Sequence, residues 1–450
     1  MKHIIALEIG SSKIRGASGT YNPATGDVTV KAVEEEKLVD CVRYGCIQNV
    51  AEVTLRVRAI ISRLQNLDPS RRIKGVYVGI GGRSVGASFA TFDRQFATEA
   101  EITDGVIQSI FEEARATKYN ERDVIDVTPR EYRVDNAIVA RPVGTVGRLV
   151  QATLNMVTAR PQIKRNIQTV INDRMQLDIN GYIVRQLALA DVVLTVEDMR
   201  LGCMLVDFGA ETTTVSIYRQ GNLQYLATLP LGSRNITRDI SVSLNHLEEN
   251  AEQLKMRGGN VLSSSVGTSY GVGEQPSEYV EMNNYVAARA GEIIANINQQ
   301  IKYAGLTADK LPGGVIIVGN GALLKGFNDA LAEALGMRVI TGTPKNVKIQ
   351  NPGIHLSEAV DVIAILHAAA KSGGLDCTEV DDQQPFVENE EDELVDEGPK
   401  ETGSQIGEKP RVVTDQPDSK PLTKVWTKFR DKVVSMMTDD EDYFDSEEES

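Results

Sequence analysis

The sequence predicts an α/β protein made of two related domains, with a small α+β insert in the first domain and an acidic tail after the second. Three observations predict this architecture. Strand-like and helix-like apolar periodicities alternate along the first 375 residues. One strand-and-turn motif occurs twice, 199 residues apart. The 450-residue chain has a net charge of −15, and residues 376–450 carry this excess with 24 acidic and 8 basic side chains.

The order of the expected elements supports two domains and an insert. Apolar residues alternate in the first nine positions before a Gly-Ser-Ser turn, which predicts a hairpin. Residues 84–158 hold a strand, a helix over 104–116 and further strands, which suits a small α+β unit. The other expected elements are helices over 51–67, 160–176, 233–247, 251–257, 277–303, 326–335 and 357–370, strands over 74–82, 181–185, 201–208 and 313–318, a hairpin over 203–218 and a loop over 258–275. The predicted segments are the first domain over 1–83 and 159–200, the second over 201–350 with a subdomain at about 233–312, a closing helix of the first domain over 351–375, a linker over 376–421, a helix over 422–438 and an acidic terminus over 439–450.

The repeated motif has the residue types of a phosphate-binding turn. Residues 7–13 align with residues 206–212 as apolar, acidic, apolar, glycine, two variable residues and a polar donor. Glycine permits a tight turn, and consecutive turn N–H groups with Ser, Thr or Lys donors form an anion nest. The acids Glu8 and Asp207, at the strand ends, could hold Mg²⁺, usually through water. Each hairpin alone is equally well an ordinary turn, whereas the matched pair indicates a clamp for the phosphates of one nucleotide.

Two further segments suit the base and ribose of a nucleotide. Residues 313–327 are typical of a strand, a Gly-rich turn and a helix start, although many α/β proteins contain this pattern. Glu252 and Lys255 share one face of a predicted helix, where they could bind a ribose and stack along a purine; a solvated ion pair is the alternative. The predicted cofactor-binding residues are Gly10, Ser11, Ser12, Lys13, Gly209, Ala210, Glu211, Thr212, Thr213, Glu252, Lys255, Gly319, Asn320, Gly321 and Ala322, with Glu8 and Asp207 as metal ligands.

The composition argues against several classes of function. The first 375 residues are nearly neutral, with 40 basic and 39 acidic side chains, so no nucleic-acid partner is expected. The four cysteines form no CxxC pair and the four histidines are scattered, which argues against a disulfide scaffold and a zinc site. The N-terminus lacks the features of a signal peptide, and no segment approaches about 18 uncharged apolar residues, so a cytosolic chain without a membrane span is expected.

The tail is expected to be a disordered acidic linker followed by an amphipathic helix. Residues 376–421 lack apolar periodicity, whereas apolar residues recur at helical spacing over 422–438 beside a basic face. Such a helix suits the interface of an anionic membrane, and docking on the body or in a partner's groove is the alternative. The acidic residues 439–450 would weaken that binding, so polymer avidity would assist it. The predicted membrane-contacting residues are Leu422, Val425, Trp426, Phe429, Val433, Lys424, Lys428 and Lys432.

These motifs, in this order, resemble those of the actin/Hsp70/sugar-kinase ATPase superfamily over residues 1 to about 375. Within it, the chain resembles the FtsA family of division proteins, which carries a small extra domain where the 84–158 insert lies. The closer resemblance also rests on RPVGTVG at 141–147, PLGSRNITRDI at 230–240 and AEQLK at 251–255. The resemblance implies duplicated actin-like (ribonuclease H-like) ATPase domains with an SHS2-type insert.

The sequence departs from the family pattern at three places. Glu8 stands where most relatives have Asp, and Asn320 replaces the second glycine of the usual adenosine turn. Residues 185–190 (RQLALA) occupy the place of a Glu-Pro-x-Ala segment that helps to position the attacking water. Gln186 could orient a water, but no acid is present there to act as a general base. ATP binding with slow or negligible hydrolysis is therefore expected.

The resemblance also implies a cellular role. It implies an ATP-binding division protein, with ATP and Mg²⁺ as cofactors, that anchors the tubulin-like FtsZ filament to the cytoplasmic face of the cell membrane at the division site. It further implies filaments of this chain, binding of the C-terminal peptide of FtsZ by the domain with the 277–303 helix, and contacts of the insert with other division proteins. Two alternatives stay open: an actin-like pilus-assembly ATP-binding protein, and a sugar or acetate kinase, which would need an acid poised for phosphoryl transfer.

Overall fold

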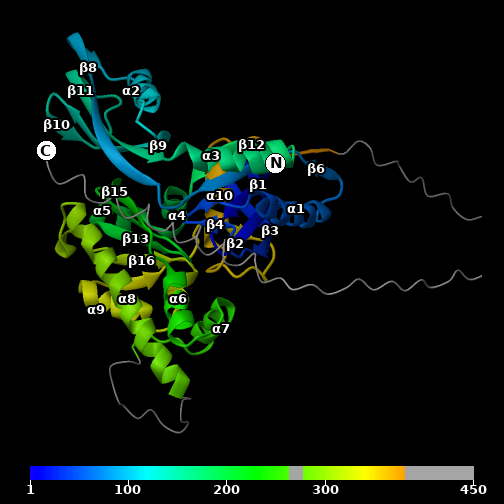
Figure 1. Cartoon of the computed structure of the whole chain (residues 1–450). Helices are drawn as coiled ribbons and strands as arrows, with labels where there is room; N and C mark the ends of the chain where they lie inside the picture. The colour runs from blue at the N-terminus through cyan, green and yellow to red at the C-terminus, as the bar shows by residue number, and fades with distance from the viewer. Residues whose placement is uncertain (263–276, 381–450) are drawn as a thin grey trace, which may run out of the picture. The chain divides into compact units, whose positions relative to one another are not determined.

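The computed structural model describes residues 1–262 and 277–380 (Figure 1). Its two largest sheets repeat one strand order. The first sheet has the order β12-β7-β1-β2-β3-β18, and the second has the order β15-β14-β13-β16-β17. The strands of the first sheet are β1 (Lys2–Ile9), β2 (Lys13–Asn22), β3 (Asp27–Lys37), β7 (Gly75–Ile80), β12 (Asp178–Val184) and β18 (Lys348–Ile349). The strands of the second sheet are β13 (Cys203–Phe208), β14 (Thr213–Arg219), β15 (Asn222–Leu229), β16 (Val315–Val318) and β17 (Val339–Thr341).

Both sheets contain the same five-strand unit. In the first, β1 pairs antiparallel with β2 and parallel with β7, and β7 pairs parallel with β12. In the second, β13 pairs antiparallel with β14 and parallel with β16, and β16 pairs parallel with β17. All six residues of β13 are buried, as is typical of a strand covered on both faces. The predicted duplication is therefore confirmed at the level of strand order and direction.

The helices of the first domain come from segments far apart in the sequence. Helix α1 (Val50–Asn66) packs on β2 and β3 with a stripe of buried residues at helical spacing, and Asn49 caps its first turn by accepting from the Glu52 N–H. Helix α10 (Val360–Lys371) is apolar almost throughout and is buried against β1, β2, β7 and α4. The other elements here are α3 (Pro161–Gln168), the π-helical turn η1 (Thr169–Arg174), α4 (Arg185–Val193), α5 (Val196–Leu201), β4 (Val42–Arg43), β5 (Cys46–Ile47), β6 (Arg71–Ile73) and β19 (Thr378–Val380).

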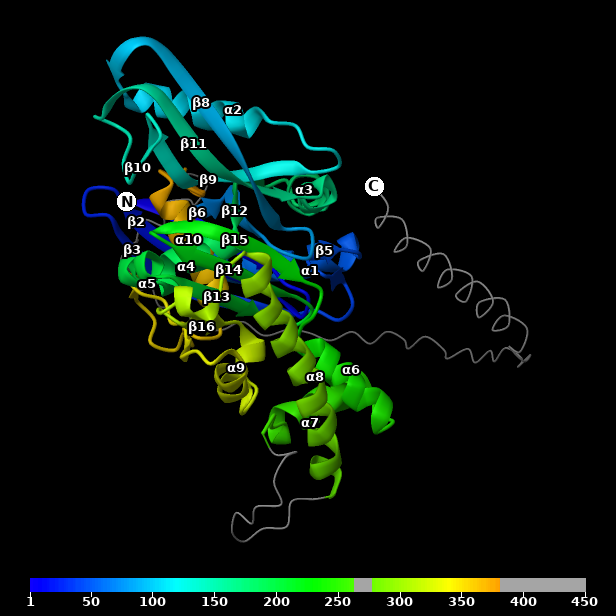
Figure 2. The same ribbon diagram turned by 90° about the vertical axis from the view of Figure 1, so that its left-hand side faces the viewer.

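The insert is a separate four-stranded sheet with one helix against it (Figure 2). Its order is β10-β9-β11-β8, and its core of buried apolar residues is distinct from the cores of the two large domains. It contacts the edge of the second sheet, where Arg130 Nη1 donates to the Gln224 carbonyl at 2.6 Å. The elements are β8 (Gly86–Glu101), α2 (Asp104–Ala116), β9 (Asp123–Val134), β10 (Ala137–Val139) and β11 (Val146–Ala159). The expected α+β insert is confirmed.

The second domain has its own core, formed largely by its sheet and by α8 and α9, which lie beside each other in Figure 1. Helix α8 contributes a buried stripe that includes Met282, Val286 and Ile293, and α6 and α7 pack against it. The elements are α6 (Ser233–Ser243), α7 (Glu248–Gly258), α8 (Ser277–Tyr303), the 3₁₀ turns η2 (Ala308–Lys310) and η3 (Asn320–Leu323), and α9 (Phe327–Leu335).

The structure corrects several predicted boundaries. The helix expected over 160–176 is α-helical only to Gln168 and continues as the π-helical turn η1. The strand expected from residue 201 begins at Cys203, because α5, with a capping box between Thr195 and Asp198, occupies the preceding residues. Strand β18 already pairs with β3 of the first sheet, so the chain returns to the first domain before residue 350. The disordered linker expected from residue 376 begins later, because residues 378–380 form β19, which pairs with β6. Residues 263–275 of the expected 258–275 loop, the rest of the predicted linker and the predicted terminal helix lie outside the described residues.

Candidate functional site

The turns of the two equivalent hairpins face one cavity of about 70 Å³. In the first turn the Gly10 N–H donates to the Lys13 carbonyl at 3.0 Å, and in the second the Gly209 N–H donates to the Thr212 carbonyl at 2.9 Å. The aligned motifs thus form the same turn in both domains. Of the predicted residues, the cavity brings together Glu8, Gly10, Ser11, Ser12, Lys13, Asp207, Gly209, Ala210, Glu211, Thr212, Gly319 and Asn320.

The guanidinium of Arg185 lies among three buried carboxylates at this cavity. Arg185 Nη2 donates to Asp207 Oδ2 at 2.6 Å and Nη1 donates to Glu8 Oε1 at 3.2 Å. Its Nε lies 3.6 Å from Asp361 Oδ1. The other Glu8 oxygen, Oε2, accepts from Arg15 Nη1 at 3.3 Å. The two predicted metal ligands therefore share one cavity, but each is bound to arginine.

A resident Mg²⁺ does not fit this arrangement of side chains. The carboxylates that would hold it, Glu8 and Asp207, already hold the guanidinium of Arg185. Among residues 1–262 and 277–380, no group of three or more His, Cys, Asp or Glu side chains is arranged to hold a metal ion. The expectation of a Glu8–Asp207 magnesium site is not supported by this geometry.

Burial changes the titration of these charged groups. Burial raises the pKa of Asp207 to about 7, and the neighbouring Arg185 opposes that rise. Burial, followed by repulsion from Asp361, raises the pKa of Glu8. Burial acts to lower the pKa of Arg185, but the carboxylates of Asp207, Asp361 and Glu8 outweigh it and raise that pKa above its ordinary value. Burial thus disfavours the charged forms of Glu8 and Asp207 more than Arg185 favours them, whereas the neighbouring carboxylates favour the charged form of Arg185.

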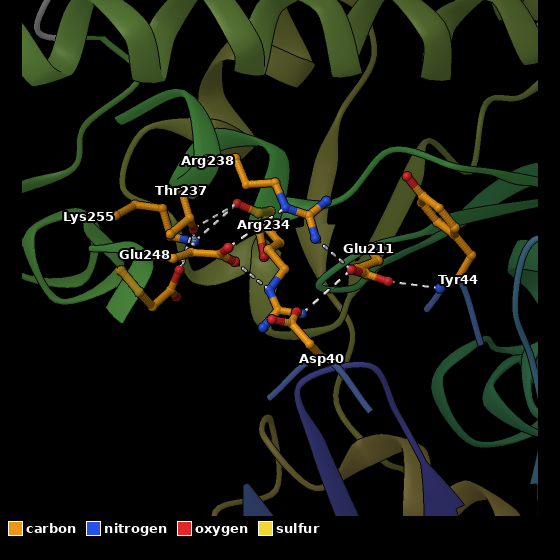
Figure 3. A network of polar contacts seen from close by, with 10 residues as sticks. Asp40, Tyr44, Glu211, Arg234, Thr237, Arg238, Glu248 and Lys255 are labelled. Atoms are coloured by element: carbon orange, nitrogen blue, oxygen red, sulfur yellow. Dashed lines mark hydrogen bonds and ion pairs between the residues drawn. The ribbon is translucent and has the colours of Figure 1, made fainter. Parts of the chain in front are cut away.

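Glu211, in the second turn, joins the first domain to α6 (Figure 3). Its Oε2 accepts from the Tyr44 backbone N–H at 2.8 Å, and its Oε1 lies 3.0 Å from Arg238 Nη2 and 3.5 Å from Arg234 Nη1. The Glu211 side chain is 0% exposed. Two arginines and a backbone N–H bind this buried carboxylate, so its role is structural. Only the backbone N–H of Glu211 could contact an anionic ligand.

The pair Glu252 and Lys255 is not a solvated surface pair, because Lys255 is buried. Its Nζ donates to Glu252 Oε2 at 2.7 Å, to Thr237 Oγ1 at 2.8 Å and to the Ser233 carbonyl at 3.1 Å, which places the ammonium against α6 (Figure 3). Burial lowers the pKa of Lys255, and Glu252 opposes this effect. An ammonium group has three donors, and all three are used here. Lys255 therefore fixes α7 to α6 and has no donor left for a ligand.

The other predicted residues lie at different distances from the cavity. Asn320 is exposed and lines it, whereas Gly321 packs near the Phe208 ring and Ala322 is buried in the second core. Thr213 is fully buried and donates its hydroxyl to the Leu231 carbonyl at 2.7 Å. Thr213, Gly321 and Ala322 therefore lie behind the residues that line the cavity.

The structure does not place Gln186, suggested to position a water, at the cavity. Its side chain is buried, and its Nε2 donates to Ser216 Oγ at 2.8 Å and to the Leu205 carbonyl at 3.3 Å, within the second sheet. The preceding residue, Arg185, reaches the cavity instead. Sequence reasoning missed Arg185 and Asp361 as site residues, although one acid in the first turn of the otherwise apolar α10 is a signal that could have found Asp361.

The predicted membrane-contacting residues over 422–438 lie outside the described residues. Within the ranges that the structure covers, none of the helices has both the length and the apolar character needed to cross a bilayer.

Comparisons with known proteins agree with the fold. A family model described as "Cell division protein FtsA" matches residues 204–359, and one described as "SHS2 domain inserted in FTSA" matches residues 90–158. The chain is 30% identical over 339 residues to the cell division protein FtsA of Porphyromonas gingivalis, covering 73% of this chain and 70% of that protein. It is 25% identical over 366 residues to FtsA of Pseudomonas aeruginosa, covering 78% of this chain and 86% of that protein.

A solved structure shows the same fold at lower sequence similarity. The PilM–PilN type IV pilus biogenesis complex matches with a TM-score of 0.59 and 17% identity, covering 82% of this chain and 98% of the matched chain. The duplicated sheets, the paired turns and the insert define a protein with an actin-like ATPase fold. The chain belongs to the FtsA family of cell division proteins.

Proposed function

We propose that this chain binds ATP between its two hairpin turns, assembles into filaments and anchors FtsZ to the cytoplasmic face of the cell membrane. The observation that supports the ATP site is the pair of equivalent turns that face one cavity. Membership of the FtsA family supports the place of this site in cell division. The match to the pilus complex supports only a common fold, so the pilus alternative is not adopted.

The turns supply the donors that a triphosphate needs. Backbone N–H groups in both turns and the residues Ser11, Ser12, Thr212 and Lys13 line the cavity. The Lys13 ammonium donates to both oxygens of Glu35 at 2.8 and 2.9 Å, which leaves its third donor for a phosphate. Its volume of about 70 Å³ is far below the roughly 300–1,000 Å³ of small-molecule sites. ATP therefore enters only when the two turns move apart, and its base and ribose would lie toward Gly319 and Asn320.

The same site supports binding with little or no hydrolysis. The four acids that line the cavity, Glu8, Asp207, Glu211 and Asp361, each form an ion pair with an arginine, so each is engaged before it could take a proton from water. Gln186 lies in the sheet. No resident Mg²⁺ belongs to this proposal, because Arg185 holds the carboxylates that would bind it.

The membrane and FtsZ parts of the proposal rest on family membership and on the sequence of the tail. The 422–438 segment combines an apolar stripe containing the chain's single Trp with a basic face, as expected for a helix that lies on an anionic membrane. The domain containing α8 is proposed to bind the C-terminal peptide of FtsZ, and the insert to contact other division proteins.

The ATP proposal is tested by equilibrium binding of ATP to the full chain. Lys13→Ala is expected to weaken binding by about tenfold, because one positive charge at the phosphates is lost. Lys74→Ala, at a half-exposed lysine away from the cavity, is the matched control and should bind like the original chain. Absence of ATP binding by the unmodified chain, or equal binding by both variants, would contradict the proposed site.

The anchoring proposal is tested by sedimentation of the full chain with anionic vesicles, with and without FtsZ. Trp426→Glu is expected to abolish pelleting, and Val412→Glu, which adds the same charge within the linker, should leave it unchanged. FtsZ should pellet only with the unmodified chain and the control. Unchanged pelleting of Trp426→Glu would rule out the helix as the anchor.

A further inference from the structure

We infer that the guanidinium of Arg185 takes the place of a divalent cation in this cleft, so that the triphosphate of a nucleotide binds here without Mg²⁺. The inference rests on the proposed function, since it concerns the same cavity. It departs from the sequence-based expectation, which made Glu8 and Asp207 the ligands of a magnesium ion.

The geometry places one positive charge where three elements meet. Glu8 is the penultimate residue of β1, Asp207 is the penultimate residue of β13, and Asp361 lies in the first turn of α10. The side chain of Arg185, at the start of α4, touches all three at 3.2, 2.6 and 3.6 Å. Its side chain is only 14% exposed, and that of Asp207 is 2% exposed. A cation bridging the two hairpins would occupy this position.

The oxygens of Glu8 and Asp207, the two predicted metal ligands, are already hydrogen-bonded or enclosed, and Asp361 Oδ1 lies 3.6 Å from Arg185 Nε without a hydrogen bond. Glu8 Oε1 accepts a hydrogen bond from Arg185, and Glu8 Oε2 accepts one from Arg15. Asp207 gives Oδ2 to Arg185, and its Oδ1 lies against Gly319, where a Cβ would come within 2.9 Å of it. Gly319 has a φ of +88°, a conformation that favours glycine and permits this close approach. A divalent ion added here would meet the guanidinium at short range, and the two positive charges would repel.

The charges near the cavity explain what Arg185 does for an anionic ligand. Glu8, Asp207 and Asp361 bring three carboxyl groups to the cavity, and their negative charge would repel a triphosphate if it were left uncompensated. In a metal-dependent site, the ion offsets such carboxylates and contacts the phosphates together. Arginine stays charged at all ordinary pH values and has five donors, so it offsets the carboxylates without a metal. The turn N–H groups and the remaining donor of Lys13 would then hold the phosphates.

The first measurement compares ATP binding by the full chain in Mg²⁺ with binding in EDTA. The expected result is an affinity in EDTA within about threefold of that in Mg²⁺. A loss of about tenfold or more in EDTA would overturn the inference, because ATP would then arrive with a metal that displaces Arg185. Absence of ATP binding in both buffers would contradict the proposed function, and the second measurement would then decide the inference alone.

The second measurement needs no nucleotide and follows Mn²⁺ by electron paramagnetic resonance. The unmodified chain is expected to bind no Mn²⁺ at the cleft, whereas Arg185→Met, which removes the guanidinium shared by three carboxylates and leaves Arg15 beside Glu8, is expected to acquire a site. Arg200→Met, at an exposed arginine in α5, is the matched control and should acquire none. Mn²⁺ binding by the unmodified chain that Asp207→Asn abolishes would overturn the inference.

A third variant covers the case in which Arg185→Met does not fold. Arg185→Lys keeps one positive charge but loses the planar fork that spans two carboxylates. It is expected to bind ATP in EDTA and to exclude Mn²⁺ like the unmodified chain. A strict requirement of this variant for Mg²⁺ would show that the charge at this position does not replace a metal, and would overturn the inference.

Discussion

The backbone N–H of Tyr44 donates to the Glu211 carboxylate at 2.8 Å, and this contact ties the first domain to the second hairpin turn (Figure 3). The same carboxylate holds Arg234 and Arg238 of α6. The buried Glu211 side chain thus connects the first domain, through Tyr44, to α6 of the second domain, beside the candidate site. Its removal should affect the stability of the fold and the width of the cavity together.

Glu211→Gln is expected to lower the free energy of unfolding by about 2–4 kcal/mol, because two arginines lose a buried anionic partner. Urea unfolding at pH 7 measures the change. The control is Glu249→Gln, at an exposed position on α7, which should stay within about 0.5 kcal/mol of the original chain. Equal stability of Glu211→Gln and the control would show that the network does not link the domains.

Asp40→Ala removes an exposed member of the same network and should have a small effect. Asp40 Oδ1 lies 3.4 Å from Arg234 Nη1, but the Asp40 side chain is 66% exposed and its charge is screened by solvent. The expected loss is below about 1 kcal/mol and should shrink further at high salt. Urea unfolding at low and high salt checks it, and a loss as large as that of Glu211→Gln would contradict this ranking.

His367 in α10 should make the fold sensitive to acid. Both of its ring nitrogens are buried and have no hydrogen-bond partner in the described part of the chain, and burial, followed by the charge of Lys371, lowers its pKa from 6.5 to about 4. As the pH falls, the unfolded chain binds this proton first, so the free energy of unfolding decreases between about pH 6.5 and 4.

His367→Leu removes this titration and is the comparison that isolates it. The stability of the variant is expected to decline less than that of the original chain when urea unfolding is repeated from pH 7 to pH 4.5. Parallel curves for the two proteins would show that His367 takes up its proton equally well in the folded and unfolded chains.

Gly232→Ala is expected to destabilise the second turn. A Cβ at Gly232 would lie 2.3 Å from the Ala210 carbonyl oxygen, and the next two residues, Ser233 and Arg234, donate their N–H groups to that turn at 3.0 and 2.7 Å. A loss of about 2–3 kcal/mol and weaker ATP binding should follow.

Gly291→Ala is the matched control for this glycine substitution. A Cβ at Gly291 meets nothing within 4 Å, and the residue lies within α8. This variant should gain about 0.5–1 kcal/mol, since alanine favours helix more than glycine does. Thermal unfolding checks both variants, and the Gly232 prediction fails if both shift in the same direction.

Local patterns predicted much of this fold, and long-range contacts account for what they missed. The aligned motifs at 7–13 and 206–212 predicted equivalent turns because glycine and strand periodicity are local properties, and the helix over 104–116 has the expected bounds. The convergence of Arg185 with Asp361 could not be predicted in that way. These residues are 176 positions apart, and only the packing of α10 on α4 brings them together.

The same limit applies to individual side chains. The spacing of Glu252 and Lys255 placed both on one helical face but could not show that this face packs on α6 and buries the lysine. Gln186 and Arg185 are neighbours in sequence at the start of α4. The Gln186 side chain points into the second sheet, and the Arg185 side chain points into the cavity. Which of two adjacent polar residues reaches a site depends on the register of the helix.

The late position of α10 determines when the first domain can be completed during synthesis. Its sheet contains β7, which ends at Ile80, yet the helix that covers it begins at Val360. The insert and the second domain have cores of their own and are translated in between. The amino-terminal sheet therefore stays without this cover until residues 360–371 have been synthesised, whereas the segments that form the other two cores are complete earlier.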